Sequence, residues 1–156
     1  VALPALSVRC GDAPSQTLAA WRNGQRVRVV AVDSASRHDI PLEDPRFQTL
    51  LITPDGTLPP PTRAFQARCV ATGADAWSVF AAIAGAAPQA FSGTQLLADR
   101  NGWLRARGAP GTTWSDADFL CTSAARGTAR STSGLDSLIA RMDAEPVRYV
   151  KGGFIH

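Results

Sequence analysis

Three cysteines, Cys10, Cys69 and Cys121, are the most reactive side chains in this 156-residue chain. None belongs to a CxxC, CxxxC or cysteine–histidine pair at metal-ligand spacing, so the sequence predicts no metal site. An odd count allows one disulfide with a free thiol, or no disulfide at all. Of these we expect a Cys69–Cys121 disulfide in an exported, periplasmic or extracytoplasmic domain, because disulfides persist in oxidising compartments.

Cys10 ends a short apolar run and precedes a predicted helix that opens near Pro14. Helix N-termini stabilise thiolates, and Arg9 adds a neighbouring positive charge. Cys10 is therefore the candidate catalytic residue, as a nucleophile or a redox sensor. The alternatives are a small buried apolar residue, or one half of a disulfide.

A polar segment between two predicted strands brings together acidic, basic and imidazole side chains: Asp33, Arg37, His38, Asp39, Glu43 and Asp44. General acid–base catalysis needs such groups to converge in a cleft. A solvated surface loop has the same composition, and we favour that interpretation. The chain contains no GxSxG, phosphate-loop or GxGxxG motif, so the sequence predicts no cofactor.

The net charge and the tryptophans indicate which macromolecules the chain could bind. The net charge of +3 comes from arginines that are scattered along predicted strands, whereas nucleic-acid binders cluster their basic residues, so we predict no nucleic-acid partner. Trp103 and Trp114 flank the turn at 108–111 and are the candidate binding residues, as a pair that could form an exposed patch. The alternative, which we favour for the tryptophans in general, is packing in the core or at its edge.

Apolar periodicity and turn residues divide the chain into alternating strands and helices. Predicted strands span 6–10, 25–33, 47–53 and 65–72, and predicted helices span 13–22, 73–84, 116–125 and 134–142. Asn101-Gly102 between two alternating runs predicts an antiparallel hairpin at residues 95–107. The length and a hydrophobic content of 45% suit a single α/β domain over residues 1–156.

Two stretches resemble thioredoxin-like domains. Arg9-Cys10-Gly11-Asp12-Ala13-Pro14 places a cysteine between a strand and its helix, as in the thioredoxin active-site turn, and residues 93–104 resemble the hairpin that follows the family's cis-proline. The resemblance implies a three-layer sandwich with a mixed sheet, in which the first two strands are parallel and residues 40–70 are an insertion.

The chain departs from this family at its chemical positions. The second active-site cysteine is replaced by Ala13, and the cis-proline position falls on Gly93 or Thr94. Fold-related copper chaperones need a CxxxC pair, and that position is Pro14. A dithiol oxidoreductase and a copper site are therefore not expected.

We therefore predict a non-catalytic thioredoxin-like domain that serves interaction or assembly. It would belong to a longer parent protein, from which it was excised. It would bind either a protein partner or the rest of the parent chain. The parent would supply any membrane contact, and copper or redox homeostasis is the expected setting by analogy of fold. The first alternative is the C-terminal appendage domain of a flavin-dependent aromatic hydroxylase, which residues 96–105 also resemble. The second is a single-cysteine thiol enzyme or redox sensor that uses Cys10.

Overall fold

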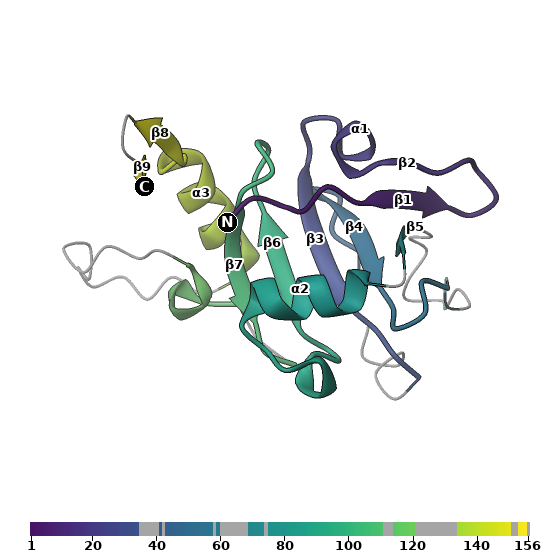
Figure 1. Ribbon diagram of the computed structural model, residues 1–156. Helices are drawn as coiled ribbons and strands as arrows, with labels where there is room; N and C mark the ends of the chain where they lie inside the picture. Colours follow the sequence, from purple (N-terminus) through teal and green to yellow (C-terminus); the bar gives the residue numbers. More distant parts are fainter. Residues whose placement is uncertain are drawn as a thin grey trace.

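The computed structural model describes residues 1–34, 41, 43–57, 59, 69–73, 75–110, 114–120, 134–150 and 153–155. They form an α/β architecture around a mixed seven-stranded sheet, ordered β2-β1-β5-β4-β3-β6-β7 (Figure 1). Its strands are β1 (Ser7–Cys10), β2 (Gln16–Thr17), β3 (Arg26–Ala31), β4 (Phe47–Ile52), β5 (Cys69–Thr72), β6 (Gln95–Ala98) and β7 (Leu104–Gly108). The helices are α1 (Leu18–Arg22), α2 (Ala76–Ala84) and α3 (Leu135–Ala144), with single 3-10 turns at η2 (Pro88–Ala90) and η3 (Asp116–Asp118). A separate hairpin pairs β8 (Arg148–Val150) with β9 (Gly153–Ile155).

The centre of the sheet is the parallel pair β3 and β4, in register from Arg26↔Phe47 to Ala31↔Ile52. β4 also runs parallel to β5, through Leu51↔Val70. Every residue of β3 is buried, and so are five of the six in β4. Strands that are buried along their whole length belong inside a sheet that is covered on both faces. The expected insertion at 40–70 is thus corrected, because this part of the chain contributes β4 and the first residues of β5.

The opening strand, β1, is not a parallel neighbour of β3. The expectation that the first two predicted strands are parallel was therefore wrong. β1 pairs antiparallel with β5 on one side and with β2 on the other. A parallel neighbour requires a crossover connection of a dozen or more residues. After Cys10 the chain instead turns back at once to form β2, and α1 is only five residues long. The first parallel pair therefore begins at β3 and not at β1.

The hairpin predicted at 95–107 is confirmed, with β6 and β7 antiparallel from Gln95↔Gly108 to Ala98↔Leu104. Its turn is organised by Asp99, whose Oδ1 accepts hydrogen bonds from the backbone N–H groups of Asn101 (2.9 Å) and Trp103 (3.0 Å). Gly102 has a φ of +83°, a conformation that glycine adopts without steric cost. The N-terminal segment pairs with the end of this hairpin, since the N–H of Leu104 donates to the carbonyl of Val1.

The helices match the sequence prediction to different degrees. α2 lies inside the predicted helix, and Gly85 is its C-cap. α3 begins one residue after the predicted start. The helix predicted at 116–125 is represented by the single turn η3, and residues 121–125 lie outside the described part of the chain. Thr17 caps α1, so the helix predicted from 13 begins only at Leu18.

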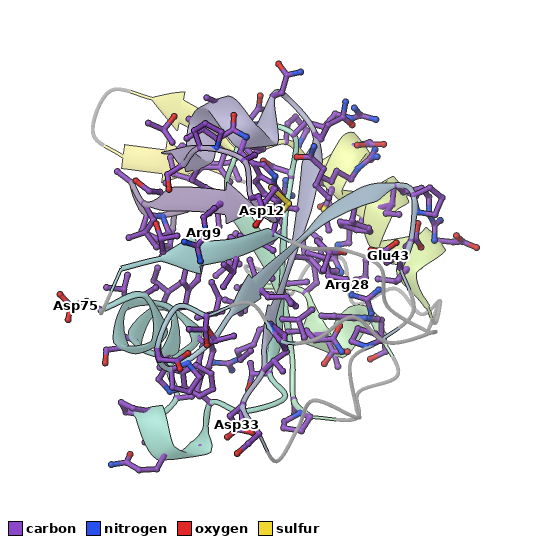
Figure 2. The ribbon with its side chains drawn as sticks, turned by 90° about the vertical axis from the view of Figure 1, so that its right-hand side faces the viewer. Arg9, Asp12, Arg28, Asp33, Glu43 and Asp75 are labelled. Atoms are coloured by element: carbon purple, nitrogen blue, oxygen red, sulfur yellow. A yellow bond between two sulfur atoms is a disulfide. The ribbon has the colours of Figure 1, made fainter. Side chains whose placement is uncertain are left out.

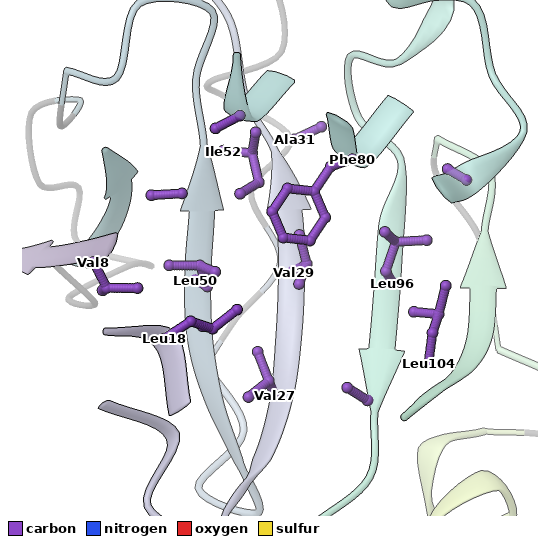
Figure 3. Close-up of a cluster of buried hydrophobic side chains, with 14 of the residues drawn as sticks. Val8, Leu18, Val27, Val29, Ala31, Leu50, Ile52, Phe80, Leu96 and Leu104 are labelled. Atoms are coloured by element: carbon purple, nitrogen blue, oxygen red, sulfur yellow. The ribbon is translucent and has the colours of Figure 1, made fainter. Parts of the chain in front are cut away.

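One face of the sheet is covered by α1 and α2 (Figure 3). Phe80 of α2 is fully buried against side chains of the central strands, among them Val29, Leu50 and Leu96. Small alanines on the same helix, such as Ala81, allow close approach to the sheet. This face is held mainly by apolar burial, and Arg107 of β7 adds a hydrogen bond to the carbonyl oxygen of Ala84 in α2.

The opposite face carries α3 and is held by arginines as well as apolar contacts. Leu138 and Met142 of α3 pack on Leu97 and Phe47. Arg105, 1% exposed, donates to Asp99 Oδ2 at 3.0 Å and to the carbonyl oxygen of Glu145 at the end of α3. These bonds tie the C-terminal end of α3 to the hairpin.

Candidate functional site

The most reactive feature among the described residues is a disulfide between Cys10 and Cys69 (Figure 2, yellow bond close to Asp12). The antiparallel pairing of β1 with β5 sets these residues directly opposite each other, with Cα atoms 4.0 Å apart. Both are half-buried at the rim of the core that lies under α1 and α2. The predicted Cys69–Cys121 pairing is thereby corrected, because Cys69 is already bonded; Cys121 lies outside the described residues.

Cys10 is consequently not the lone thiol that the sequence suggested. It ends a strand, and the tight turn after it, in which the N–H of Ala13 donates to the carbonyl of Cys10, leads into β2. α1 starts eight positions further on, at Leu18. Cys10 therefore does not lie at a helix N-terminus that could stabilise a thiolate, and in the oxidised chain its sulfur is bonded to Cys69.

A pocket of about 440 Å³ opens beside Cys69. Its wall is formed by the segment that enters β4, by that strand's first residues and by α1, with the lining residues Trp21, Glu43, Asp44, Pro45, Phe47, Gln48, Thr49 and Cys69. Cys69, and not Cys10, lines this pocket. One cysteine of the disulfide therefore borders a space of the size that small-molecule ligands occupy.

The electrostatic character of this pocket is acidic. Hydrogen bonds from the side chain of Arg46 hold the pKa of Asp44 below its ordinary value, so Asp44 is ionised at neutral pH. Arg46 also pairs with Asp136 in the first turn of α3. Glu43 is exposed at the same pocket. Burial also lowers the pKa of Arg28, which lies in β3. The nearby negative charge of Asp44 partly offsets this effect.

A second hollow, of about 400 Å³, lies at the carboxyl ends of the parallel strands β3 and β4. It is lined by Val32, Asp33, Ser34, Thr53, Pro54, Asp55, Thr57 and Pro59. Asp55 Oδ1 accepts hydrogen bonds from the hydroxyl (2.6 Å) and the backbone N–H (3.1 Å) of Thr57, and these bonds lower the pKa of Asp55. Asp55 is therefore a solvent-facing anion at neutral pH.

The acid, base and imidazole groups of residues 33–44 do not meet in one cleft as far as they are described. Asp33 lines the hollow at the strand ends, whereas Glu43 and Asp44 line the pocket beside Cys69. Figure 2 shows Asp33 and Glu43 well separated. Arg37, His38 and Asp39 fall outside the described residues. The described geometry agrees with the surface-loop interpretation.

The predicted tryptophan patch is corrected. Trp114 is 6% exposed and packs in the core beneath α3, beside Phe119. Trp103 is half-buried, and its backbone forms an isolated antiparallel β-bridge with Ala2. The two rings therefore do not form an exposed binding surface. Sequence reasoning missed Trp21 as a pocket residue, because its position near Cys69 depends on strand order and not on local spacing.

Two searches of the described residues gave negative results. No three of their histidine, cysteine and acidic side chains are grouped so that they could hold a metal ion. Their helices are also too short or too polar to cross a lipid bilayer.

The chain matches no protein-family model, no curated protein and no solved structure. The interpretation of its function therefore depends on its own residues and geometry.

Proposed function

We propose that this chain is a non-catalytic, thioredoxin-like domain of a larger exported protein, and that it serves interaction or assembly. From β3 onward the elements are three parallel strands (β3, β4 and β5), a helix, an antiparallel hairpin and a helix, and the last three of these elements follow the order expected for that fold. The expected order also has a helix between its first two strands, and the described residues between β3 and β4 contain none. α2 and α3 pack on opposite faces of the sheet, which supports a three-layer arrangement. The proposed match begins at β3 and not at β1.

One observation carries the non-catalytic part of the proposal. In dithiol oxidoreductases of this kind, a cysteine pair follows the first parallel strand. Here that strand is β3, and the sequence from Val32 to Arg46 contains no cysteine. Gly93 and Thr94 occupy the place before the hairpin, and the described residues contain no cis peptide bond. The only described disulfide lies elsewhere, between β1 and β5.

The hollow at the ends of β3 and β4 supports the binding part of the proposal. Ligands of open α/β sheets bind outside the carboxyl ends of the strands, where neighbouring connections diverge. From β3 the sheet continues through parallel β4 on one side and antiparallel β6 on the other. The exposed anion Asp55 favours a partner that presents basic or hydrogen-bond-donating groups. Export is supported by the disulfide, since such bonds are rare in reducing compartments.

The decisive experiment is an insulin-reduction assay on the purified chain, together with thiol titration of the oxidised protein. We expect no turnover above the Cys10→Ser/Cys69→Ser variant, and one titratable thiol per chain, from Cys121. Sustained turnover that this double substitution abolishes would contradict a non-catalytic domain.

A further inference from the structure

We propose that the Cys10–Cys69 bond is a thiol–disulfide exchange site, attacked at the Cys69 sulfur from the pocket beside it. In this inference the chain is the substrate of an external dithiol reductant that is neutral or positively charged. The inference goes beyond the proposed function and does not depend on it, because a domain without catalytic turnover can still be reduced by another molecule.

The first argument is access. Cys69 lines a pocket of about 440 Å³, which has room for a thiol-bearing side chain. Exchange requires an attacking thiolate to reach one sulfur of the disulfide, and the sulfur that is attacked decides which cysteine leaves. Because Cys69 borders the pocket and Cys10 does not, attack at Cys69 with release of Cys10 is the favoured direction.

The second argument is that the surrounding structure does not depend on the bond alone. β1 keeps three further pairs with β5, at Ser7↔Thr72, Val8↔Ala71 and Arg9↔Val70. Val8 is fully buried in the core, and this burial holds the strand independently of the sulfur atoms. The disulfide can therefore open in the folded protein, without global unfolding.

The third argument is selectivity by charge. Glu43 and the ionised Asp44 both line the pocket through which the thiolate must approach. Asp44 is partly balanced by Arg46, at 2.6 Å, whereas Glu43 is exposed at the pocket. A second negative charge on the attacking molecule adds to this repulsion, so anionic thiols such as glutathione are disfavoured relative to neutral ones.

The exchange conserves atoms and electrons. A thiolate of the reductant attacks Cys69 Sγ, which forms a mixed disulfide and releases Cys10 as a thiolate that takes up a proton. The second thiol of the reductant loses its proton and attacks the reductant's own sulfur in the mixed disulfide. The products are the oxidised reductant, with its new sulfur–sulfur bond, and two thiols at Cys10 and Cys69.

The test uses the full chain in native buffer and two monothiols, neutral mercaptoethanol and anionic mercaptoethanesulfonate. Samples are quenched with acid, alkylated and digested with trypsin, which places Cys10, Cys69 and Cys121 on separate peptides spanning 10–22, 69–100 and 108–126. We expect the mixed disulfide on the peptide 69–100, formed faster than the global unfolding rate measured in the same buffer by hydrogen exchange. A mixed disulfide on 10–22, or reduction no faster than unfolding, would overturn the proposal.

A second arm tests the role of the pocket. Glu43→Gln should raise the rate with mercaptoethanesulfonate, which attacks with two negative charges, by about two- to threefold, and the rate with mercaptoethanol, which attacks with one, by less, as expected for one nearby charge near water. Asp75→Asn removes an exposed carboxylate at the start of α2 and should change neither rate. Equal effects of Glu43→Gln on both thiols would contradict attack through this pocket.

Discussion

The two faces of the sheet are stabilised by different forces. Under α2 the contacts are mainly apolar, around the buried ring of Phe80, and one arginine of the sheet, Arg107, donates to the carbonyl oxygen of Ala84 at the end of the helix. Under α3 the apolar contacts are joined by buried arginines, with Arg105 bonded to Asp99 and Arg26 bonded to Asp143 at 2.6 Å. The difference shows that one face of a sheet can depend mainly on apolar burial, whereas the other also depends on ion pairs such as Arg26–Asp143, whose partners are far apart in the sequence.

The largest expected effect is on the apolar face. Phe80→Ala should lower the free energy of unfolding by about 4 kcal/mol, because it removes a fully buried ring and leaves a cavity. Urea denaturation followed by far-UV circular dichroism measures this loss. Ser78→Ala, at an exposed position of the same helix, is the control and should change the stability by no more than about 0.5 kcal/mol. A loss below about 1 kcal/mol at Phe80 would mean that α2 is not docked as described.

A smaller loss, with a different signature, is expected on the arginine face. Arg105→Met should cost about 3 kcal/mol, because Asp99 keeps a buried carboxylate without its cation. Adding Asp99→Asn should recover part of this loss, measured as a coupling free energy in a double-mutant cycle. Arg9→Met, at an exposed position of β1, is the control. Additive losses at Arg105 and Asp99 would show that the two side chains do not form a stabilising pair.

The smallest effect concerns pH and the link between Arg46, Asp44 and α3. The folded pKa of Asp44 is lowered, so its stabilising contribution is present above the unfolded value of about 4 and is lost as the pH falls through the folded pKa. Asp44→Asn should therefore cost no more than about 1 kcal/mol at pH 7, because Arg46 is partly exposed, and the difference should shrink below pH 4. Thermal melts from pH 3 to pH 7 measure it. A difference that grows on acidification would have the wrong sign.

The sequence predicted best where the information is local. The hairpin at 95–107 followed from Asn101-Gly102, and α2 followed from apolar periodicity that ends at Gly85. Strand neighbours were not predictable, because β1 pairs with β5 across about sixty residues and no local pattern encodes that choice. The same cause explains the error in the disulfide, since register on the sheet, and not spacing along the chain, brings Cys10 to Cys69.

The candidate site shows the same limit. Asp44 and Glu43 were singled out by residue type, but their association with Cys69 and Trp21 depends on the path of the chain into β4. Trp114 was a candidate for an exposed patch because of the turn that precedes it, yet its ring lies in the core beneath α3. The sequence of that turn does not specify which way the ring points.

The pairing of the cysteines is the claim on which this account most depends, and non-reducing peptide mapping tests it directly. The oxidised chain is alkylated without reduction and digested with trypsin, which separates the three cysteines onto peptides 10–22, 69–100 and 108–126. The structure predicts a single cross-linked species that joins 10–22 to 69–100, with Cys121 alkylated. A species that joins 69–100 to 108–126 would contradict the cross-strand disulfide, and with it the exchange site beside Glu43.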